Sequence, residues 1–434
     1  MTSTFSLSPG GSLRGDLRVP GDKSISHRSI MLGALAEGRT TVTGFLDGED
    51  CLATLAAFQA MGVPIERQES NTVIIDGVGL QGLKAPGGPL DMGNSGTAMR
   101  LLCGVLAGQE FDSVLAGDAS LSRRPMRRVT EPLARMGARI DTTESGTPPL
   151  RVRGGQLLAG QRHTLAVASA QVKSALLLAG LWSRGETCVT EPAPTRDHTE
   201  RMLQGFGYEV RRDGSTVCLV GGGRLRACPV DVPADISSAA FFLVGATIAP
   251  GSDVLLRHVG VNPTRTGVID ILRLMGASIE VLERREIGGE PVADLRVQWA
   301  PLHGIEIPQE LVPLAIDEFP ALFVAAACAD GDTLLTGAEE LRVKESDRIQ
   351  VMADGLGVLG VECEVRPDGI RIRGRESLGK GVIESHGDHR IAMSFAMAAL
   401  RSEGSLEIRD CANVATSFPG FPEMARAAGL GIRA

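Results

Sequence analysis

One pattern recurs six times along the 434 residues, and it limits the folds open to the chain. Each copy has a small or polar turn, an apolar stretch suited to a helix, a glycine-containing break and a short strand. The copies begin at residues 20, 92, 168, 232, 315 and 385, so successive starts are 72, 76, 64, 83 and 70 residues apart. Because regular spacing of this kind is typical of a repeat architecture, we expect six equivalent α/β units.

A second element lies between these copies: a helix that ends at Met-Gly or an equivalent pair and is followed by a strand. Stretches of this kind lie at 55–68, 132–143, 202–212, 271–283 and 352–365. Glycine just after the last helical turn favours the left-handed cap that ends a helix. The sequence therefore predicts two helices and several short strands in every repeat.

Six repeats can form one solenoid or two globular halves. We favour two halves, because six units exceed what one hydrophobic core normally holds. The predicted first lobe is 21–233, and the second lobe combines 1–20 with 234–434. The strand expected within 5–20 would close the second lobe, so the chain would cross between lobes twice.

Composition excludes several classes of protein. A net charge of −8 argues against a broad nucleic-acid surface. No apolar run is long enough to span a bilayer, and the first residues lack the pattern of a secretory signal, so we expect a cytoplasmic protein that binds no membrane. The eight cysteines show no paired spacing, which favours reduced thiols over disulfides or a zinc framework.

The predicted helix starts carry small residues and basic residues. Free backbone N–H groups at a helix N-terminus attract anions, and small residues let a ligand approach them. A single arginine there is most simply a solvated surface charge, but the set together indicates ligands with several negative charges. The basic residues at or near these starts are Lys23, Arg28, Arg100, Arg124, Lys173, Arg196, Lys344, Arg348 and Arg390.

Acidic residues accompany the cations in the last two repeats. Asp317 would stay ionised beside them and could act as a base, whereas Glu318 is expected only to cap its helix. His386 and His389 have the spacing of a metal pair, but no third ligand is evident, so no metal site is predicted.

Six strings in chain order resemble the enolpyruvyl transferase family, over essentially the whole chain. They are PGDKSISHR (20–28), GNSGTAMR (93–100), RPM (124–126), SAQVK (169–173), RVKESDR (342–348) and DHRIAM (388–393). RDHTE (196–200) and NPTR (262–265) further resemble its class II branch. The resemblance implies an α/β fold: a two-lobe inside-out α/β barrel, each lobe made of three βαβαββ repeats, with the active site in the cleft between the lobes.

The resemblance also implies a reaction in the shikimate pathway of aromatic amino acid biosynthesis. The enolpyruvyl group of phosphoenolpyruvate would move to the 5-hydroxyl of shikimate 3-phosphate, with release of phosphate, in a monomer that needs no cofactor. Asp317, Glu345 and Lys23 would be catalytic. Shikimate 3-phosphate would contact Lys23, Ser24, Arg28, Ser169, Ala170, Gln171, Arg196, Asp317 and Lys344. Phosphoenolpyruvate would contact Lys23, Gly96, Arg124, Gln171, Arg348 and Arg390.

Two positions depart from relatives that the chain resembles. Gly96 stands where glyphosate-insensitive members carry alanine, so inhibition by glyphosate is expected. Thr416 stands where class I members carry a lysine that holds phosphoenolpyruvate, and Arg196 or Arg390 would replace that contact.

Three other classes of protein are less consistent with the sequence. An enolpyruvyl transferase acting on UDP-N-acetylglucosamine would carry a cysteine in the loop at 115–128, and this loop has none. A non-catalytic binder of anionic metabolites would lack the pair Asp317 and Glu345. A P-loop phosphotransferase would need GxxxxGK[ST], which does not occur.

Overall fold

The computed structural model describes residues 3–434, and within it the chain divides into two compact units. The first unit comprises Gly21–Val232 together with Glu286–Glu290. The second comprises the chain up to Pro20, Pro233–Arg285 and Pro291–Ala434. Each unit has its own hydrophobic core.

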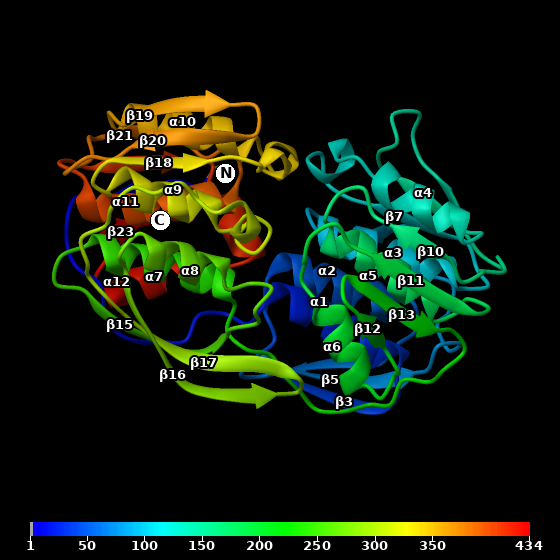
Figure 1. Ribbon diagram of the computed structural model, residues 1–434. Coiled ribbons are helices and arrows are strands. Elements are labelled where there is room, and N and C mark those ends of the chain that lie inside the picture. The colour runs from blue at the N-terminus through cyan, green and yellow to red at the C-terminus, as the bar shows by residue number, and fades with distance from the viewer. Residues whose placement is uncertain (1–2) are drawn as a thin grey trace. The chain divides into compact units, whose positions relative to one another are not determined.

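Every repeat contributes one inner helix, which confirms the sixfold pattern. In the first unit these are α1 (Lys23–Leu35), α3 (Gly96–Ala107) and α5 (Ala170–Gly180), and in the second α7 (Ile236–Ile248), α9 (Phe319–Ala327) and α11 (His389–Ala398). All 13 residues of α7 and all nine of α9 are buried. Because these helices are apolar on all sides, they need cover on every face, and α7, α9 and α11 lie together inside the second unit (Figure 1).

Every repeat also contributes an outer helix. These are α2 (Glu49–Ala60), α4 (Arg127–Arg135), α6 (His198–Gly205), α8 (Gly267–Leu274), α10 (Arg348–Val358) and α12 (Phe421–Ala428). The glycine after each of the five predicted Met-Gly-type ends has a positive φ, as at Gly137 (105°) and Gly276 (103°). The predicted left-handed caps are therefore confirmed.

Three sheets surround the inner helices of the first unit. In spatial order their strands are β14 (Val230–Asp231), β3 (Glu37–Thr43), β5 (Thr72–Val78) and β4 (Ile65–Gln68); β6 (Leu90–Asp91), β7 (Ser113–Ala116), β9 (Leu150–Arg153) and β8 (Arg139–Asp141); and β10 (Arg162–Thr164), β11 (Glu186–Thr190), β13 (Thr216–Val220) and β12 (Arg211–Asp213). In each sheet the strand that follows the inner helix has one parallel and one antiparallel neighbour.

The second unit repeats this plan. Its sheets are β16 (Ser278–Ile287), β17 (Glu290–Gln298), β15 (Asp253–Gly260) and β2 (Arg14–Leu17); β18 (Asp332–Leu335), β20 (Gly369–Arg373) and β19 (Glu362–Arg366); and β21 (Gly381–Glu384), β22 (Leu406–Arg409), β1 (Phe5–Leu7) and β23 (Ile432–Arg433). Isolated parallel bridges beside β18 take the place of the fourth strand in its sheet.

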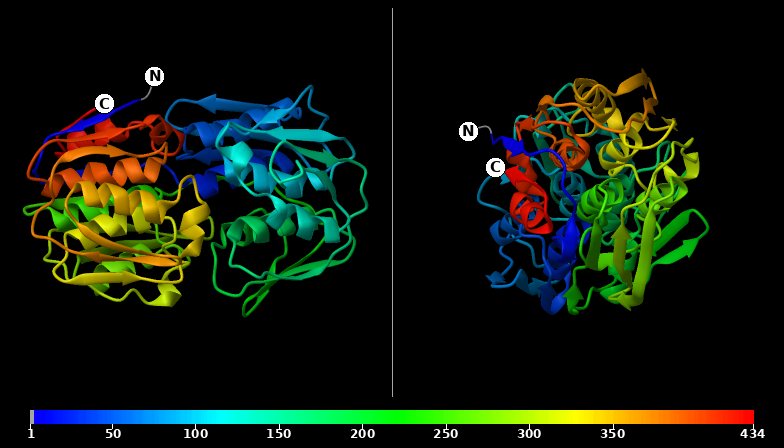
Figure 2. Two further views of the ribbon diagram at one scale, coloured as in Figure 1. Left: turned by 90° about the horizontal axis from the view of Figure 1, so that it is seen from above. Right: turned by 90° about the vertical axis from the view of Figure 1, so that its left-hand side faces the viewer.

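Within residues 3–434, the first and the last segments both belong to the second unit. The strand β2 pairs in parallel with β15, and β1 lies antiparallel to β22 and β23, so the first and last described strands share one sheet (Figure 2). Residues 286–290, at the tip of the β16–β17 hairpin, belong instead to the first unit. The sequence did not indicate this excursion.

Close packing of the inner helices depends on small residues. A Cβ at Gly104 of α3 would lie 2.1 Å from the carbonyl oxygen of Ala175 in α5, so no larger residue fits. Among residues 3–434, none of the helices has the length and hydrophobicity to cross a membrane.

The expectation that all cysteines are reduced thiols is wrong for one pair. Cys188 on β11 and Cys218 on β13 are directly opposite in antiparallel register and form a disulfide. The other six cysteines are free thiols. This pair could not be predicted from spacing, because strand pairing joins two residues that are 30 positions apart.

Candidate active site

The start of α1 carries three of the predicted site residues: Lys23, Ser24 and Arg28. The Asp22 carboxylate caps the helix by accepting a backbone N–H at 2.8 Å. The Lys23 ammonium lies 2.6 Å from the Asp50 carboxylate, which holds it at the first turn. This end of α1 therefore combines a helix N-terminus with a fixed cation, a suitable arrangement for an anion.

Arg28 is buried one turn further along the helix and has three hydrogen bonds. Its guanidinium donates to the Ser24 carbonyl at 2.9 Å, to Ser174 Oγ at 2.8 Å and to Thr199 Oγ1 at 2.7 Å. Burial lowers the pKa of Arg28 to about 10, and the charge of nearby Arg196 adds to this effect. The carboxylates of Glu200 and Asp22 act in the opposite direction, so burial is the main cause of the lowered pKa.

The starts of α3 and α5 meet around Gly96. A Cβ on Gly96 would lie 3.1 Å from a terminal nitrogen of Arg124 and 3.2 Å from one of Arg100, so both guanidinium groups face the first turn of α3. Arg124 donates to Asn94 Oδ1 at 2.7 Å, and Arg100 donates to Gln171 Oε1 at 2.6 Å. These contacts bring Gly96, Arg124 and Gln171, all predicted to bind phosphoenolpyruvate, into one cluster.

Two further predicted residues of the first unit, Ser169 and Ala170, lie at the start of α5, and Arg196 lies just before α6. Ser169 caps α5 by accepting a backbone N–H at 3.4 Å, and Ala170 is its first residue. Lys173, one turn further, does not face a ligand: it is fully buried and pairs with Glu191 at 2.7 Å and Glu200 at 2.8 Å. Its inclusion among the ligand-facing cations was therefore wrong.

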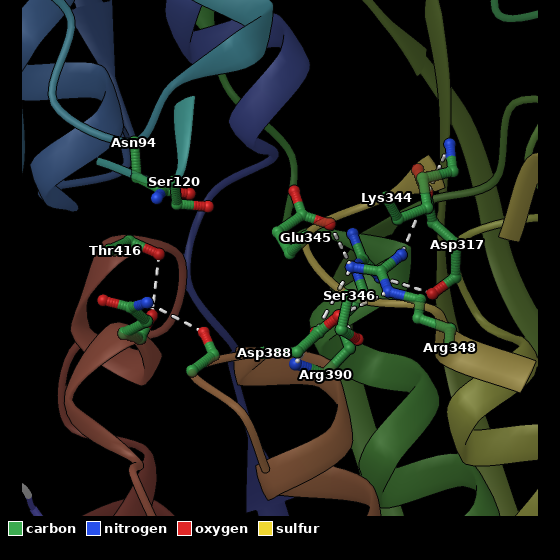
Figure 3. Close-up of polar contacts among 12 residues, drawn as sticks. Asn94, Ser120, Asp317, Lys344, Glu345, Ser346, Arg348, Asp388, Arg390 and Thr416 are labelled. Atoms are coloured by element: carbon green, nitrogen blue, oxygen red, sulfur yellow. Dashed lines mark hydrogen bonds and ion pairs between the residues drawn. The ribbon is translucent and has the colours of Figure 1, made fainter. Parts of the chain in front are cut away.

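In the second unit, Arg348 is the centre of a cluster of carboxylates. Its guanidinium lies 2.9 Å from Asp388, 2.6 Å from Glu345 and 3.5 Å from Asp317 (Figure 3). Only 1% of the Arg348 side chain is exposed. Arg348 is therefore a shared cation that orients both predicted proton-transfer residues, Glu345 and Asp317.

Within this cluster, burial and the neighbouring charges shift the pKa values in opposite directions. Burial alone would lower the pKa of Arg348, but Asp388, Glu345 and Asp317 outweigh it and raise that pKa above its usual value. Burial would likewise raise the pKa of Asp388, but Arg348 outweighs it and lowers that pKa. Both groups are therefore charged at neutral pH.

Asp317 has cations on two sides and is still partly exposed. Its Oδ1 lies 3.4 Å from the Lys344 ammonium as well as close to Arg348, and 13% of its side chain is accessible. Arg390 donates to the Asp317 backbone carbonyl at 2.9 Å. Four predicted residues of the second unit, Asp317, Lys344, Arg348 and Arg390, thus lie in one connected group with Glu345.

Glu318 has a different role from the one predicted. It precedes α9 but its side chain makes no capping hydrogen bond. The buried carboxylate instead accepts from Ser237 Oγ and lies 3.6 Å from Arg390 and 3.8 Å from Arg265. It therefore anchors Arg390.

The Thr416 side chain is held within its own turn. Its hydroxyl donates to the Asn413 carbonyl at 2.7 Å within the same 3-10 turn, and the side chain is mostly buried (Figure 3). The residue supplies no charge to the cluster.

Sequence reasoning missed several residues that hold the site together. Asp388 and Asn94 lie inside the quoted strings but were given no role. Asp388 directly precedes α11, and a short acid at that position is a signal for a cap. Asp50 and Thr199 had no such signal, because they contact their partners only through packing between helices.

Only one group in the described part of the chain has side chains placed like metal ligands: Glu186, Cys188 and Cys218. Both of its sulfur atoms are in the disulfide. The cluster lies on the paired strands β11 and β13.

Each unit is thus a threefold α/β repeat with buried helices, and each places cations at or near helix starts: Lys23 and Arg28 on α1 in the first unit, and Arg348 on α10 and Arg390 on α11 in the second. This combination defines a protein that binds small molecules with several negative charges. The sequence profile of EPSP synthase (3-phosphoshikimate 1-carboxyvinyltransferase) matches residues 7–424. The chain belongs to this family.

Individual relatives agree over nearly the full chain. The 3-phosphoshikimate 1-carboxyvinyltransferase of Alkalilimnicola ehrlichii is 70% identical over 428 residues, which is 99% of this chain and 96% of that protein. The protein of the same name from Methylococcus capsulatus is 69% identical over 428 residues, 99% of this chain and 98% of that protein.

The solved structures agree with the fold. An EPSP synthase structure from Acinetobacter baumannii has a TM-score of 0.90 at 60% identity and covers 100% of this chain and 99% of that one. The enolpyruvyl transferase NikO from Streptomyces tendae, at 18% identity and a TM-score of 0.78, shares the fold over 99% of this chain and 98% of its own. The predicted family and the inside-out α/β barrel fold are confirmed.

Proposed function

We propose that this chain is the enzyme that transfers the enolpyruvyl group of phosphoenolpyruvate to the 5-hydroxyl of shikimate 3-phosphate and releases phosphate. The matching family and its relatives carry the name of this reaction. It belongs to the shikimate pathway of aromatic amino acid biosynthesis. One observation supports the chemistry most directly: Asp317, a partly exposed carboxylate, lies between Lys344 and Arg348 and shares the second cation with Glu345.

The reaction proceeds by addition and then elimination. In the addition, the 5-hydroxyl oxygen attacks C2 of phosphoenolpyruvate, Asp317 accepts the hydroxyl proton, and Glu345 donates a proton to C3 with assistance from Lys23. In the elimination, the C2–O bond to phosphate breaks while C3 loses a proton. These steps are proton transfers and C–O bond changes, so we propose no metal and no organic cofactor.

The substrates together bring two phosphates and two carboxylates, which repel one another unless cations share the site. For shikimate 3-phosphate we propose contacts with Lys23, Ser24, Arg28, Ser169, Ala170, Gln171, Arg196, Asp317 and Lys344. For phosphoenolpyruvate we propose Lys23, Gly96, Arg124, Gln171, Arg348 and Arg390. The burial of Arg28 and Arg348 suits groups that are held rigidly before the substrate arrives.

The proposal is tested by measuring phosphate release with Asp317→Asn. Removal of the base should lower kcat by about 10²–10⁴-fold, the usual contribution of a general base. Glu340→Gln is the matched control, because Glu340 also pairs with Lys344, at 3.8 Å, but has no proposed role in proton transfer. Equal activity of the two variants would refute the assignment of Asp317.

The acceptor is tested in the same assay. Shikimate 3-phosphate should support phosphate release, and UDP-N-acetylglucosamine should not. If neither acceptor supports turnover while both phosphorylated substrates bind, the chain would be a binder of anionic metabolites. We further propose that the enzyme acts as a monomer in the cytoplasm, which sedimentation of the purified protein and fractionation of cells would test.

A further inference from the structure

The first turn of α6 connects three parts of the first unit. Thr199 Oγ1 accepts from Arg28 at 2.7 Å and donates to Ser174 at 2.7 Å. Glu200 pairs with the buried Lys173 at 2.8 Å. His198 extends in another direction, and its Nδ1 lies 2.7 Å from Glu290 Oε1. The placement of Arg28 therefore depends on how this turn is held.

Glu290 comes from the tip of the β16–β17 hairpin, far along the chain from α6. It is only 4% exposed and His198 only 2%, so both groups of the pair are out of solvent. A second contact supports the same junction: Arg201 donates to the Gly289 carbonyl at 2.8 Å and pairs with Asp197, the residue before α6, at 2.9 Å. Two successive hairpin residues thus hold the first turn of α6.

The chemistry of the two groups determines which one donates the hydrogen bond. An ionised carboxylate only accepts hydrogen bonds, so the proton of His198 must be on Nδ1. A buried hydrogen bond to a charged group is stronger than one between neutral groups. The Glu290 charge also acts on Arg28, where it opposes the lowering of the pKa by burial.

The position of the Arg28 guanidinium depends on its hydrogen-bond partners. Its three hydrogen-bond partners within residues 3–434 are uncharged: the Ser24 carbonyl, Ser174 and Thr199. One of them, Thr199, belongs to α6 and follows His198 directly. A shift of the α6 turn would therefore move a partner of Arg28.

We propose that Glu290 is a positioning residue for shikimate 3-phosphate. Through His198 it fixes the first turn of α6, and through Thr199 it fixes the guanidinium of Arg28. The inference rests on the proposed function, which assigns Arg28 to this substrate. Neither Glu290 nor His198 is among the proposed substrate contacts.

The test is steady-state kinetics of Glu290→Gln. The KM for shikimate 3-phosphate should rise by about ten-fold or more, the effect of losing one buried charge-assisted hydrogen bond. The KM for phosphoenolpyruvate and kcat should change by less than about three-fold, because the cations assigned to that substrate are held by other elements, as Lys23 is by Asp50 and Arg124 by Asn94. Glu286→Gln, which removes the same charge from an exposed position in the same hairpin tip, should leave all three constants unchanged.

A double variant tests whether Glu290 acts through His198. If Glu290 acts through His198, then His198→Gln and Glu290→Gln together should raise the KM no more than either change alone. Additive effects would overturn the route through His198. An unchanged KM in Glu290→Gln, or an equal rise in KM for both substrates together with a lower melting temperature, would overturn the positioning role.

Calorimetry separates this inference from the proposed function. Wild-type protein that does not bind shikimate 3-phosphate would refute the proposed function. Wild-type protein that binds it, with a Glu290→Gln variant that binds it equally well, would refute only the role of Glu290.

Discussion

Replacement of Asp388 by asparagine should destabilise the second unit specifically. Asp388 is fully buried and its carboxylate has three kinds of partner. It accepts from Arg348 Nε at 2.9 Å, from Ser346 Oγ at 3.0 Å and, as the cap of α11, from the Arg390 backbone N–H at 3.0 Å. Asparagine has nearly the same shape, so the variant removes the charge and changes little of the packing.

The expected loss of stability depends on which ion-pair partners Arg348 keeps in the variant. An asparagine oxygen can still cap α11, but the amide N–H₂ cannot accept from a guanidinium. Removing one partner of a buried ion pair typically costs about 3–5 kcal/mol. Glu345 and Asp317 remain at 2.6 and 3.5 Å from Arg348, so we expect the lower end of this range, about 3 kcal/mol.

The effect should also depend on pH. The pKa of Asp388 is lowered in the folded protein. Its stabilising contribution is therefore complete above the unfolded pKa of about 3.9 and is lost as the pH falls through the lower folded value. The stability difference between wild type and Asp388→Asn should be constant near neutral pH and should shrink under strongly acidic conditions.

Urea denaturation followed by tryptophan fluorescence can resolve the two units. The chain has two tryptophans, Trp182 in the first unit and Trp299 in the second. In a Trp182→Phe background the fluorescence reports on the second unit alone, whose transition should move to lower urea. Asp347→Asn is the matched control: this residue caps α10 but is 36% exposed, so it should cost only about 1 kcal/mol. A loss in Asp388→Asn no larger than in this control would refute the reasoning.

Two further predictions concern the first unit. Gly96→Ala would place a Cβ 3.1 Å from Arg124 and 3.2 Å from Arg100, so both guanidinium groups must shift by a few tenths of an ångström. The KM for phosphoenolpyruvate should rise by about three- to ten-fold, since small displacements at a reacting centre are costly. Inhibition by glyphosate should weaken more than kcat/KM falls, and equal inhibition of both proteins would contradict the steric account. Alkylation of the unfolded, unreduced protein should modify six cysteines by mass spectrometry, against eight after reduction, and eight before reduction would contradict the Cys188–Cys218 bond.

Local sequence was enough to predict the repeat and its helices. Glycine at Gly137 and Gly276 predicted left-handed helix ends, and both have a positive φ. The small residues around Gly96 predicted a helix start open to anions, and α3 begins there. These features could be predicted because capping and helical periodicity depend on neighbours within one or two turns.

The roles of individual charges were harder to predict. Lys173 and Lys23 are both lysines near helix starts, yet Lys173 is buried between two carboxylates, whereas Lys23 is partly exposed and pairs with one. Their sequence surroundings do not differ in any way that decides this. The partners of Lys173 come from β11 and α6, and only the packing of these elements brings them within reach.

The sequence by itself therefore determined the sixfold α/β repeat, the helix starts that carry cations and the family to which the chain belongs. Only the tertiary structure decided that Arg348 is shared by Asp317, Glu345 and Asp388, that Cys188 pairs with Cys218, and that Glu290 supports α6. The physical reason is the separation along the sequence between the residues that interact. Helix ends and turns are fixed by interactions between residues close in sequence, whereas the partner of a buried charge or thiol is fixed by which distant elements pack against it.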